Sequence, residues 1–118
     1  MVFNQERVGD VRVIRIREKK LTSHEAPEMK TKFLELIIQE GDKLLVNLKD
    51  VQNMDSTGLG SFLFGIRQAE HYGKDLRFCE IQPKVQFLIR IAHLDKVIDI
   101  YDTEKEALED FQKVSEDG

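Results

Sequence analysis

The 118-residue sequence contains a single cysteine, Cys79, and this scarcity already excludes several kinds of protein. One cysteine can form neither an internal disulfide nor a cysteine-rich metal site. Its position beside Phe78 in an apolar stretch predicts a small core residue. No apolar run is long enough to cross a bilayer, and the first six residues lack the apolar run of a signal peptide. We therefore expect a cytoplasmic protein that does not insert into membranes.

The sequence also lacks an excess of positive charge. It has 18 lysines and arginines against 22 aspartates and glutamates, which gives a formal net charge of −4 at pH 7. A non-specific nucleic-acid binder usually carries a basic excess or a basic stripe. The one short basic run fits a solvated strand edge and comprises Arg15, Arg17, Lys19 and Lys20. We expect no nucleic-acid partner, and an acidic single domain is compatible with a monomer.

Strand-like and helix-like segments alternate along the chain after an N-terminal hairpin. The hairpin is predicted over residues 3–8 and 11–17, with a tight turn at Gly9 and Asp10. Further strands are expected over 43–48, 76–81 and 97–101, and helices over 26–39, from the 55–60 loop to about residue 71, over 83–91, and from 103 onward.

This order of elements predicts an α/β fold with a mixed β-sheet. Strand–helix–strand units imply right-handed crossovers between parallel strands, whereas the hairpin adds an antiparallel pair. A length of 118 residues, of which 41% are hydrophobic and 34% charged, suits one small folded domain. We therefore expect a single domain over 1–118 with βα repeats and about four helices. Residues 114–118 are expected to form a frayed tail.

Apolar residues at helical spacing predict which side chains face the core. The second strand has Val11 and Val13 on one side and Ile14 and Ile16 on the other, which indicates a strand inside the sheet or a bulge near Val13. The helical residues expected to face inward are Ala26, Met29, Phe33, Leu36, Ile37, Leu59, Phe62, Leu63, Ile66, Ala69, Val85, Leu88, Ile89, Ala107, Leu108 and Phe111.

The stretch Asp55-Ser56-Thr57-Gly58-Leu59-Gly60 places two hydroxyls beside a carboxylate at an expected helix start. A helix start offers unpaired N–H groups and a partial positive charge, so it tolerates an anion. Ser56 or Thr57 is therefore a candidate for phosphorylation. A second interpretation stays open, in which Asp55 or Ser56 is a plain helix cap and the glycines allow close packing.

Catalytic and metal-binding patterns are missing around this stretch. A nucleophile elbow needs a glycine two residues before the serine, and a phosphate-binding Walker loop needs a lysine after its second glycine. The three histidines, His24, His71 and His93, have neither metal-ligand spacing nor the near spacing of a base for Ser56. We expect a protein that is not an enzyme and has no catalytic residues, metal site or cofactor.

Residues Met54 to Gly60, after the strand at 44–48 and the link at 49–51, closely resemble the signature of STAS domains. Among these, the chain is most similar to the bacterial anti-sigma factor antagonists, and the resemblance covers nearly the whole chain. It implies that Ser56 is phosphorylated by a partner, an anti-sigma factor and serine kinase of the histidine-kinase-like ATPase class. A serine phosphatase would reset the switch.

The same resemblance implies a role for each residue of the partner-binding loop. Asp55 is the acidic neighbour of the phosphoacceptor, Thr57 is a second hydroxyl that is a further candidate for modification, and Gly58 lets the partner approach closely. Leu59 completes the loop that binds the partner. The unphosphorylated protein would bind the anti-sigma factor, and phosphorylation of Ser56 would release it.

Two segments depart from the family pattern. Family members often have Gly-Glu-Leu-Asp or Gly-Asp-Ile-Asp where this chain has Lys19-Lys20-Leu21-Thr22, and Ser-Gly-Leu where it has Ala92-His93-Leu94. Both departures bear on the identity of the partner. Two alternative functions also stay open: a STAS binding module of a transporter or sensory complex without phospho-control, and a nucleotide-binding STAS domain, since the helix start could hold a phosphate of a free nucleotide.

Overall fold

The structure is a computed structural model that describes residues 1–39 and 41–117, with side chains described for 1–39 and 41–113. A five-stranded sheet with the order β1-β2-β4-β6-β7 forms the centre, and β3 and β5 form a separate two-stranded sheet. The elements are β1 Phe3–Val8, β2 Val11–Ile16, β3 Lys20–Leu21, α1 Ala26–Ile38, β4 Lys43–Asn47, β5 Asn53–Met54, α2 Ser56–His71, β6 Asp75–Cys79, α3 Pro83–Ile91, the 3-10 helix η1 Leu94–Lys96, β7 Asp99–Tyr101 and α4 Glu104–Asp117.

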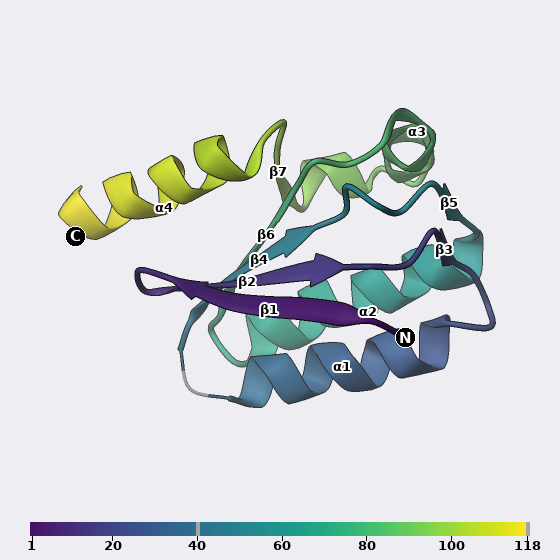
Figure 1. The fold of residues 1–118 in the computed structure, drawn as a ribbon, viewed down its shortest axis with the longest axis horizontal. Coiled ribbons are helices and arrows are strands. Elements are labelled where there is room, and N and C mark those ends of the chain that lie inside the picture. Colours follow the sequence, from purple (N-terminus) through teal and green to yellow (C-terminus); the bar gives the residue numbers. More distant parts are fainter. Residues whose placement is uncertain (40, 118) are drawn as a thin grey trace.

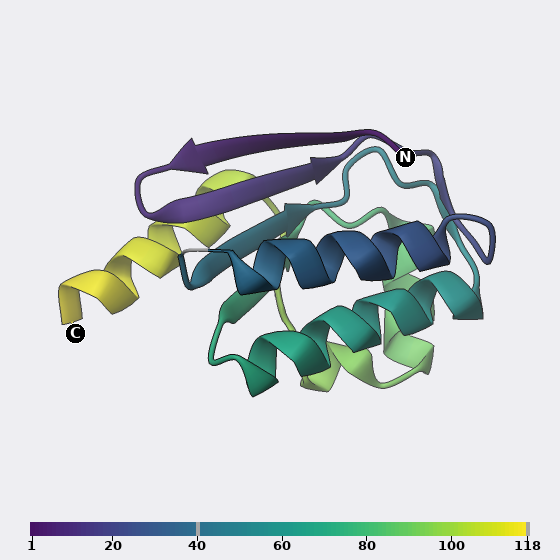
Figure 2. The same cartoon turned by 90° about the horizontal axis from the view of Figure 1, so that it is seen from below.

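The sheet is mixed, as the sequence predicts. Strand β1 is antiparallel to β2, whereas β2, β4, β6 and β7 are parallel neighbours. Helices α1 and α2 lie side by side on one face of the sheet, and α4 lies on the other (Figure 1, Figure 2). The small α/β domain with four α-helices is therefore confirmed.

Strand β2 lies inside the sheet between β1 and β4. Its residues pair one to one with β1 from Phe3 opposite Ile16 to Val8 opposite Val11, so the alternative of a bulge is wrong. Ile14 and Ile16 belong to the large core cluster with α1 and α2. Val11 and Val13 belong to a smaller cluster with Phe111 of α4. Both faces of β2 are apolar because helices cover both sides of the sheet.

Helix α1 follows its predicted pattern closely. All five expected residues, Ala26, Met29, Phe33, Leu36 and Ile37, are buried. The α1–α2 contact is close at Gly65, where an added Cβ would lie 2.8 Å from the Phe33 ring. The Phe33 ring meets Phe62 edge-on at 5.6 Å, and Phe62 stacks on Phe78 at 5.6 Å. These aromatic contacts join both helices to the sheet.

Several details differ from the expectations. The expected strand at 97–101 begins only at Asp99, because Val97 and Ile98 form a turn and a bend after η1. Leu108, expected to be buried, is half-buried at the edge of the smaller cluster, and Leu63 and Leu88 are also half-buried. The frayed tail predicted for 114–118 falls on residues whose side chains are not described, and Gly118 lies outside the described residues.

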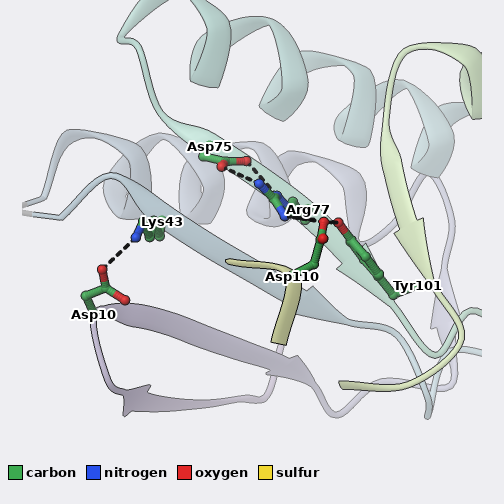
Figure 3. A network of polar contacts seen from close by, with 6 residues as sticks. All are labelled: Asp10, Lys43, Asp75, Arg77, Tyr101 and Asp110. Carbon is green, nitrogen blue, oxygen red and sulfur yellow. Dashed lines mark hydrogen bonds and ion pairs between the residues drawn. The ribbon is translucent and has the colours of Figure 1, made fainter. Parts of the chain in front are cut away.

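A polar network joins α4 to the sheet (Figure 3). Arg77 of β6 is only 6% exposed. It donates to both carboxylate oxygens of Asp75 at 2.9 and 2.8 Å, and to Tyr101 Oη and Asp110 Oδ2 at 3.0 Å each. Its guanidinium lies 4.0 Å from the centre of the Phe111 ring. Burial and the hydrogen bond to Asp110 raise the pKa of Tyr101 to about 12.

Candidate functional site

The short parallel pair β3–β5 positions the candidate site. Lys20 pairs with Asn53 and Leu21 with Met54, so the chain reaches the start of α2 beside the loop that precedes α1. The sequence did not predict this pair, because two residues per strand show no periodicity. Figure 1 shows β3, β5 and the start of α2 together at one end of the molecule.

Asp55 is the N-cap of α2. Its Oδ1 accepts a hydrogen bond from Gly58 N at 2.8 Å, and its Oδ2 accepts one from Ser23 N at 3.1 Å. Its backbone oxygen accepts from Leu59 N at 2.9 Å. One carboxylate therefore satisfies a free N–H group of the helix start and ties that start to the loop before α1. Ser23 belongs to the site, but nothing in the sequence signals this distant contact.

Ser56 and Thr57 are the first two residues of α2, and both side chains are exposed. Within the described part of the chain, neither hydroxyl takes part in a side-chain hydrogen bond. Their N–H groups lie in the first turn, where no intrahelical acceptor is available. Of the two capping alternatives, Asp55 is therefore the cap, and the Ser56 hydroxyl stays accessible beside the positive end of the helix.

Gly58 and Leu59 lie inside the domain. An added Cβ at Gly58 would lie 1.9 Å from Leu21 O and 2.8 Å from Leu21 C. Within the domain, the close approach that Gly58 allows is therefore to the backbone of β3, whereas the close approach of a partner at Gly58 stays a prediction. Leu59 is 7% exposed and belongs to the large core cluster. By contrast, Gly60 is exposed, and an added Cβ there meets no atom within 4 Å.

The other candidate chemical groups lie apart from this loop or inside the core. Cys79 is buried as predicted, and burial raises the pKa of its thiol to about 12. His24, His71 and His93 are exposed. Among the described residues, no group of three or more histidine, cysteine, aspartate or glutamate side chains is arranged to hold a metal ion.

The two departures from the family pattern have clear local structures. His93 has a φ of 60°, a left-handed conformation that glycine adopts most easily. Thr22 Oγ1 donates to Glu25 Oε2 at 2.7 Å, and Thr22 N donates to the same oxygen at 2.9 Å. Lys20 is exposed on β3.

Residues 3–107 match the family model of the STAS domain, so the chain belongs to the STAS family. The anti-sigma F factor antagonist of Paenibacillus polymyxa is 34% identical over 74 residues, so the match spans 63% of that relative and 63% of this chain. A homologue of TM1081 from Thermotoga neapolitana is 30% identical over 112 residues, which cover 94% of this chain and 98% of the relative.

A solved structure gives the same fold. The Bacillus anti-sigma factor antagonist SpoIIAA, in its unphosphorylated form, has a TM-score of 0.70 at 23% identity, with 94% of this chain and 98% of that chain covered. A structure of SpoIIAA in its phosphorylated form also matches with a TM-score of 0.70.

In residues 1–39 and 41–117, no helix combines the length and apolar character that crossing a membrane requires.

Replacing Asp55 with alanine tests the capping geometry. The variant removes the acceptor of both Gly58 N and Ser23 N, so we expect the free energy of unfolding to fall by about 1 to 2 kcal/mol. Urea denaturation followed by circular dichroism measures the change. Asp95→Ala, which removes an exposed carboxylate from η1, is the matched control and should stay within about 0.5 kcal/mol of wild type. Equal stabilities of the two variants would contradict the assigned cap.

Proposed function

We propose that the protein is a cytoplasmic anti-sigma factor antagonist controlled by phosphorylation of Ser56. The observation that carries this proposal is the exposed, unengaged Ser56 hydroxyl at the first position of a helix already capped by Asp55. The names of the STAS relatives support the anti-sigma factor as the kind of partner. In this proposal the partner is a serine kinase of the histidine-kinase-like ATPase class, and a serine phosphatase removes the phosphate.

The partner-binding surface in this proposal is the Asp55–Leu59 loop with the exposed side of α2. Ser56 and Thr57 offer their side chains to the partner directly. Gly58 and Leu59 act from inside, since their packing holds the start of α2 against Leu21. The protein acts as a monomer that presents this one loop.

The switch depends on a difference in electrostatics between the free and the bound protein. Phosphorylation adds about −1.5 to −2 charge at Ser56. In the free protein, this charge lies at a helix N-terminus, where an anion is favoured by roughly 0.3 to 1 kcal/mol. At a close-fitting interface, a like charge or a desolvated phosphate costs several kcal/mol. The fold therefore tolerates phosphorylation, whereas the complex dissociates.

Phosphosite mapping tests the modification itself. Protein purified from its native cells with phosphatase inhibitors should carry phosphate on Ser56, as read by phosphopeptide mass spectrometry. Ser56→Ala expressed in the same cells should lose this phosphate, because the main proposed acceptor is gone, and any phosphate that remains on Thr57 would show that Thr57 is modified as well. Thr57→Val is the control, and it should still be phosphorylated at Ser56. Phosphate on Thr57 alone, or none on either residue, would refute the assignment of Ser56.

A further inference from the structure

The carboxyl ends of three adjacent parallel strands enclose a hollow that the proposed function does not use. The hollow is lined by residues that follow β2, β4 and β6, and its volume is about 480 Å³. In open α/β sheets, ligands bind preferentially at this edge. A second hollow of about 290 Å³ shares Gln52 and Gln82 with the first and extends past Asn53 to Lys84. The two hollows therefore share part of their lining, and the second also reaches Asn53 of β5.

This surface, called here the basic groove, is defined by Arg17, Lys19, Lys49, Gln52, Gln82 and Lys84. Its charge is opposite in sign to the net charge of −4 of the protein. Two acidic residues also line the hollow, but both already have partners. Asp50 pairs with Arg17 at 3.1 Å, and Glu18 accepts a hydrogen bond from Val2 N at 2.7 Å.

Two ammonium groups of the basic groove are available to a ligand. Lys19 and Lys49 are exposed, and among the described residues neither side chain has an ion pair or a hydrogen bond. Lys84 lies farther along the groove, where its Nζ donates to Asn53 Oδ1 at 3.2 Å. Unpaired lysines brought to one surface from separate loops attract anionic groups.

The walls of the basic groove are held together by contacts between loops. Lys19 O accepts hydrogen bonds from Gln52 N at 2.9 Å and from Asn53 N at 3.0 Å. Gln82 Nε2 donates to Lys49 O at 2.6 Å. These bonds join the segments after β2, β4 and β6, so the groove is formed before any ligand binds. A preformed surface loses less conformational entropy on binding.

The shape and lining of the basic groove indicate an acidic polypeptide segment as its ligand. A nucleotide base needs an apolar or aromatic surface against which to stack, and none of the described residues that line either hollow is aromatic. The lining instead offers ammonium groups and amide side chains that come from separate loops, which suits the several carboxylates of an acidic peptide segment.

We propose that the basic groove binds an acidic, extended segment of the partner protein. The inference rests on the proposed function, because it assigns a second contact surface for the same partner. Asn53 of β5 lines the groove, and Ser56 follows three positions later at the start of α2. In this proposal, one partner contacts both the groove and the loop that carries Ser56. The groove supplies affinity for an acidic partner, and Ser56 supplies the control.

An NMR titration with a defined peptide tests the basic groove. The probe is a blocked decapeptide of alternating glutamate and serine, added to isotope-labelled protein at low salt. We expect shifts at the backbone amides of Lys19, Lys49 and Gln52. The same peptide with glutamine in place of glutamate should cause none, because it lacks the carboxylates. Shifts that map elsewhere, or none at millimolar peptide, would overturn the proposal.

Charge reversal supplies the matched comparison. Lys19→Glu combined with Lys49→Glu should weaken peptide binding about tenfold. Lys105→Glu combined with Lys113→Glu makes the same change in net charge on exposed residues of α4 and should stay within about twofold of wild type. Equal weakening by both pairs would show a net-charge effect and overturn the groove.

A titration with ATP distinguishes a peptide ligand from a nucleotide ligand. ATP at the same concentration should shift the backbone amides of Lys19, Lys49 and Gln52 less than the glutamate peptide does. Stronger shifts with ATP would overturn the peptide proposal in favour of a nucleotide ligand. The titration uses unphosphorylated protein without a kinase. The two proposals can therefore fail separately. The peptide can fail to bind although Ser56 is phosphorylated in cells, and the peptide can bind although no phosphate is found on Ser56.

Discussion

Gly58→Ala is expected to lower the free energy of unfolding by about 3 kcal/mol or more, although alanine is the better helix former. The added methyl group would lie 1.9 Å from Leu21 O, so the start of α2 and the backbone of β3 must separate. Neither neighbour yields easily, because the close atoms belong to the backbone. Separation also weakens the hydrogen bond between Ser23 N and Asp55, which crosses the same contact.

Gly60→Ala is the matched control for Gly58→Ala. It lies in the same helix, is exposed, and its added Cβ would meet no atom within 4 Å. Only helix propensity then acts, so we expect a gain of about 1 kcal/mol. Urea denaturation of both variants measures two changes of opposite sign. If Gly58→Ala proved as stable as Gly60→Ala, the close contact with Leu21 would be wrong.

The contrast between these glycines shows where sequence reasoning stops. The sequence indicated that the glycines permit a close approach, either to a partner or within the fold. It could not decide between them, since the decisive contact joins Gly58 to Leu21, a residue of another element. By contrast, the buried face of α1 could be predicted, because the spacing of apolar residues within one helix indicates which side faces the core. All the α1 residues expected to face inward are buried.

Polar residues inside the fold were also beyond the sequence. Arg77 has a charged side chain in an apolar strand, and its partner Asp110 comes from α4, 33 residues later. Ser61 is fully buried in α2, where its hydroxyl donates to Gly58 O at 2.5 Å. Such polar side chains can be buried because partners elsewhere in the chain or in the same helix form hydrogen bonds with them. The spacing of apolar residues in the sequence does not indicate those partners. Asp55 could be predicted as a candidate cap because capping chemistry is local, whereas phosphorylation of Ser56 stays a prediction.

Ser56→Asp is expected to weaken binding to the anti-sigma factor about 100-fold. The variant places a permanent negative charge where the phosphate would lie, and repulsion or desolvation at the interface costs several kcal/mol. Isothermal titration calorimetry with the purified partner measures the dissociation constant. Ser56→Asn is the matched control, because its side chain has nearly the same size without the charge. It should bind within about tenfold of wild type, the cost of one altered hydrogen bond.

The stability of Ser56→Asp should change in the opposite direction from its binding. A carboxylate in the first turn of α2 faces the positive end of the helix, so we expect a gain of roughly 0.3 to 1 kcal/mol in urea denaturation. A variant that is more stable but binds less tightly has lost an interface and not its fold. Wild-type affinity in Ser56→Asp would contradict phospho-control, and the constitutive binding module would then be the better account of this STAS domain.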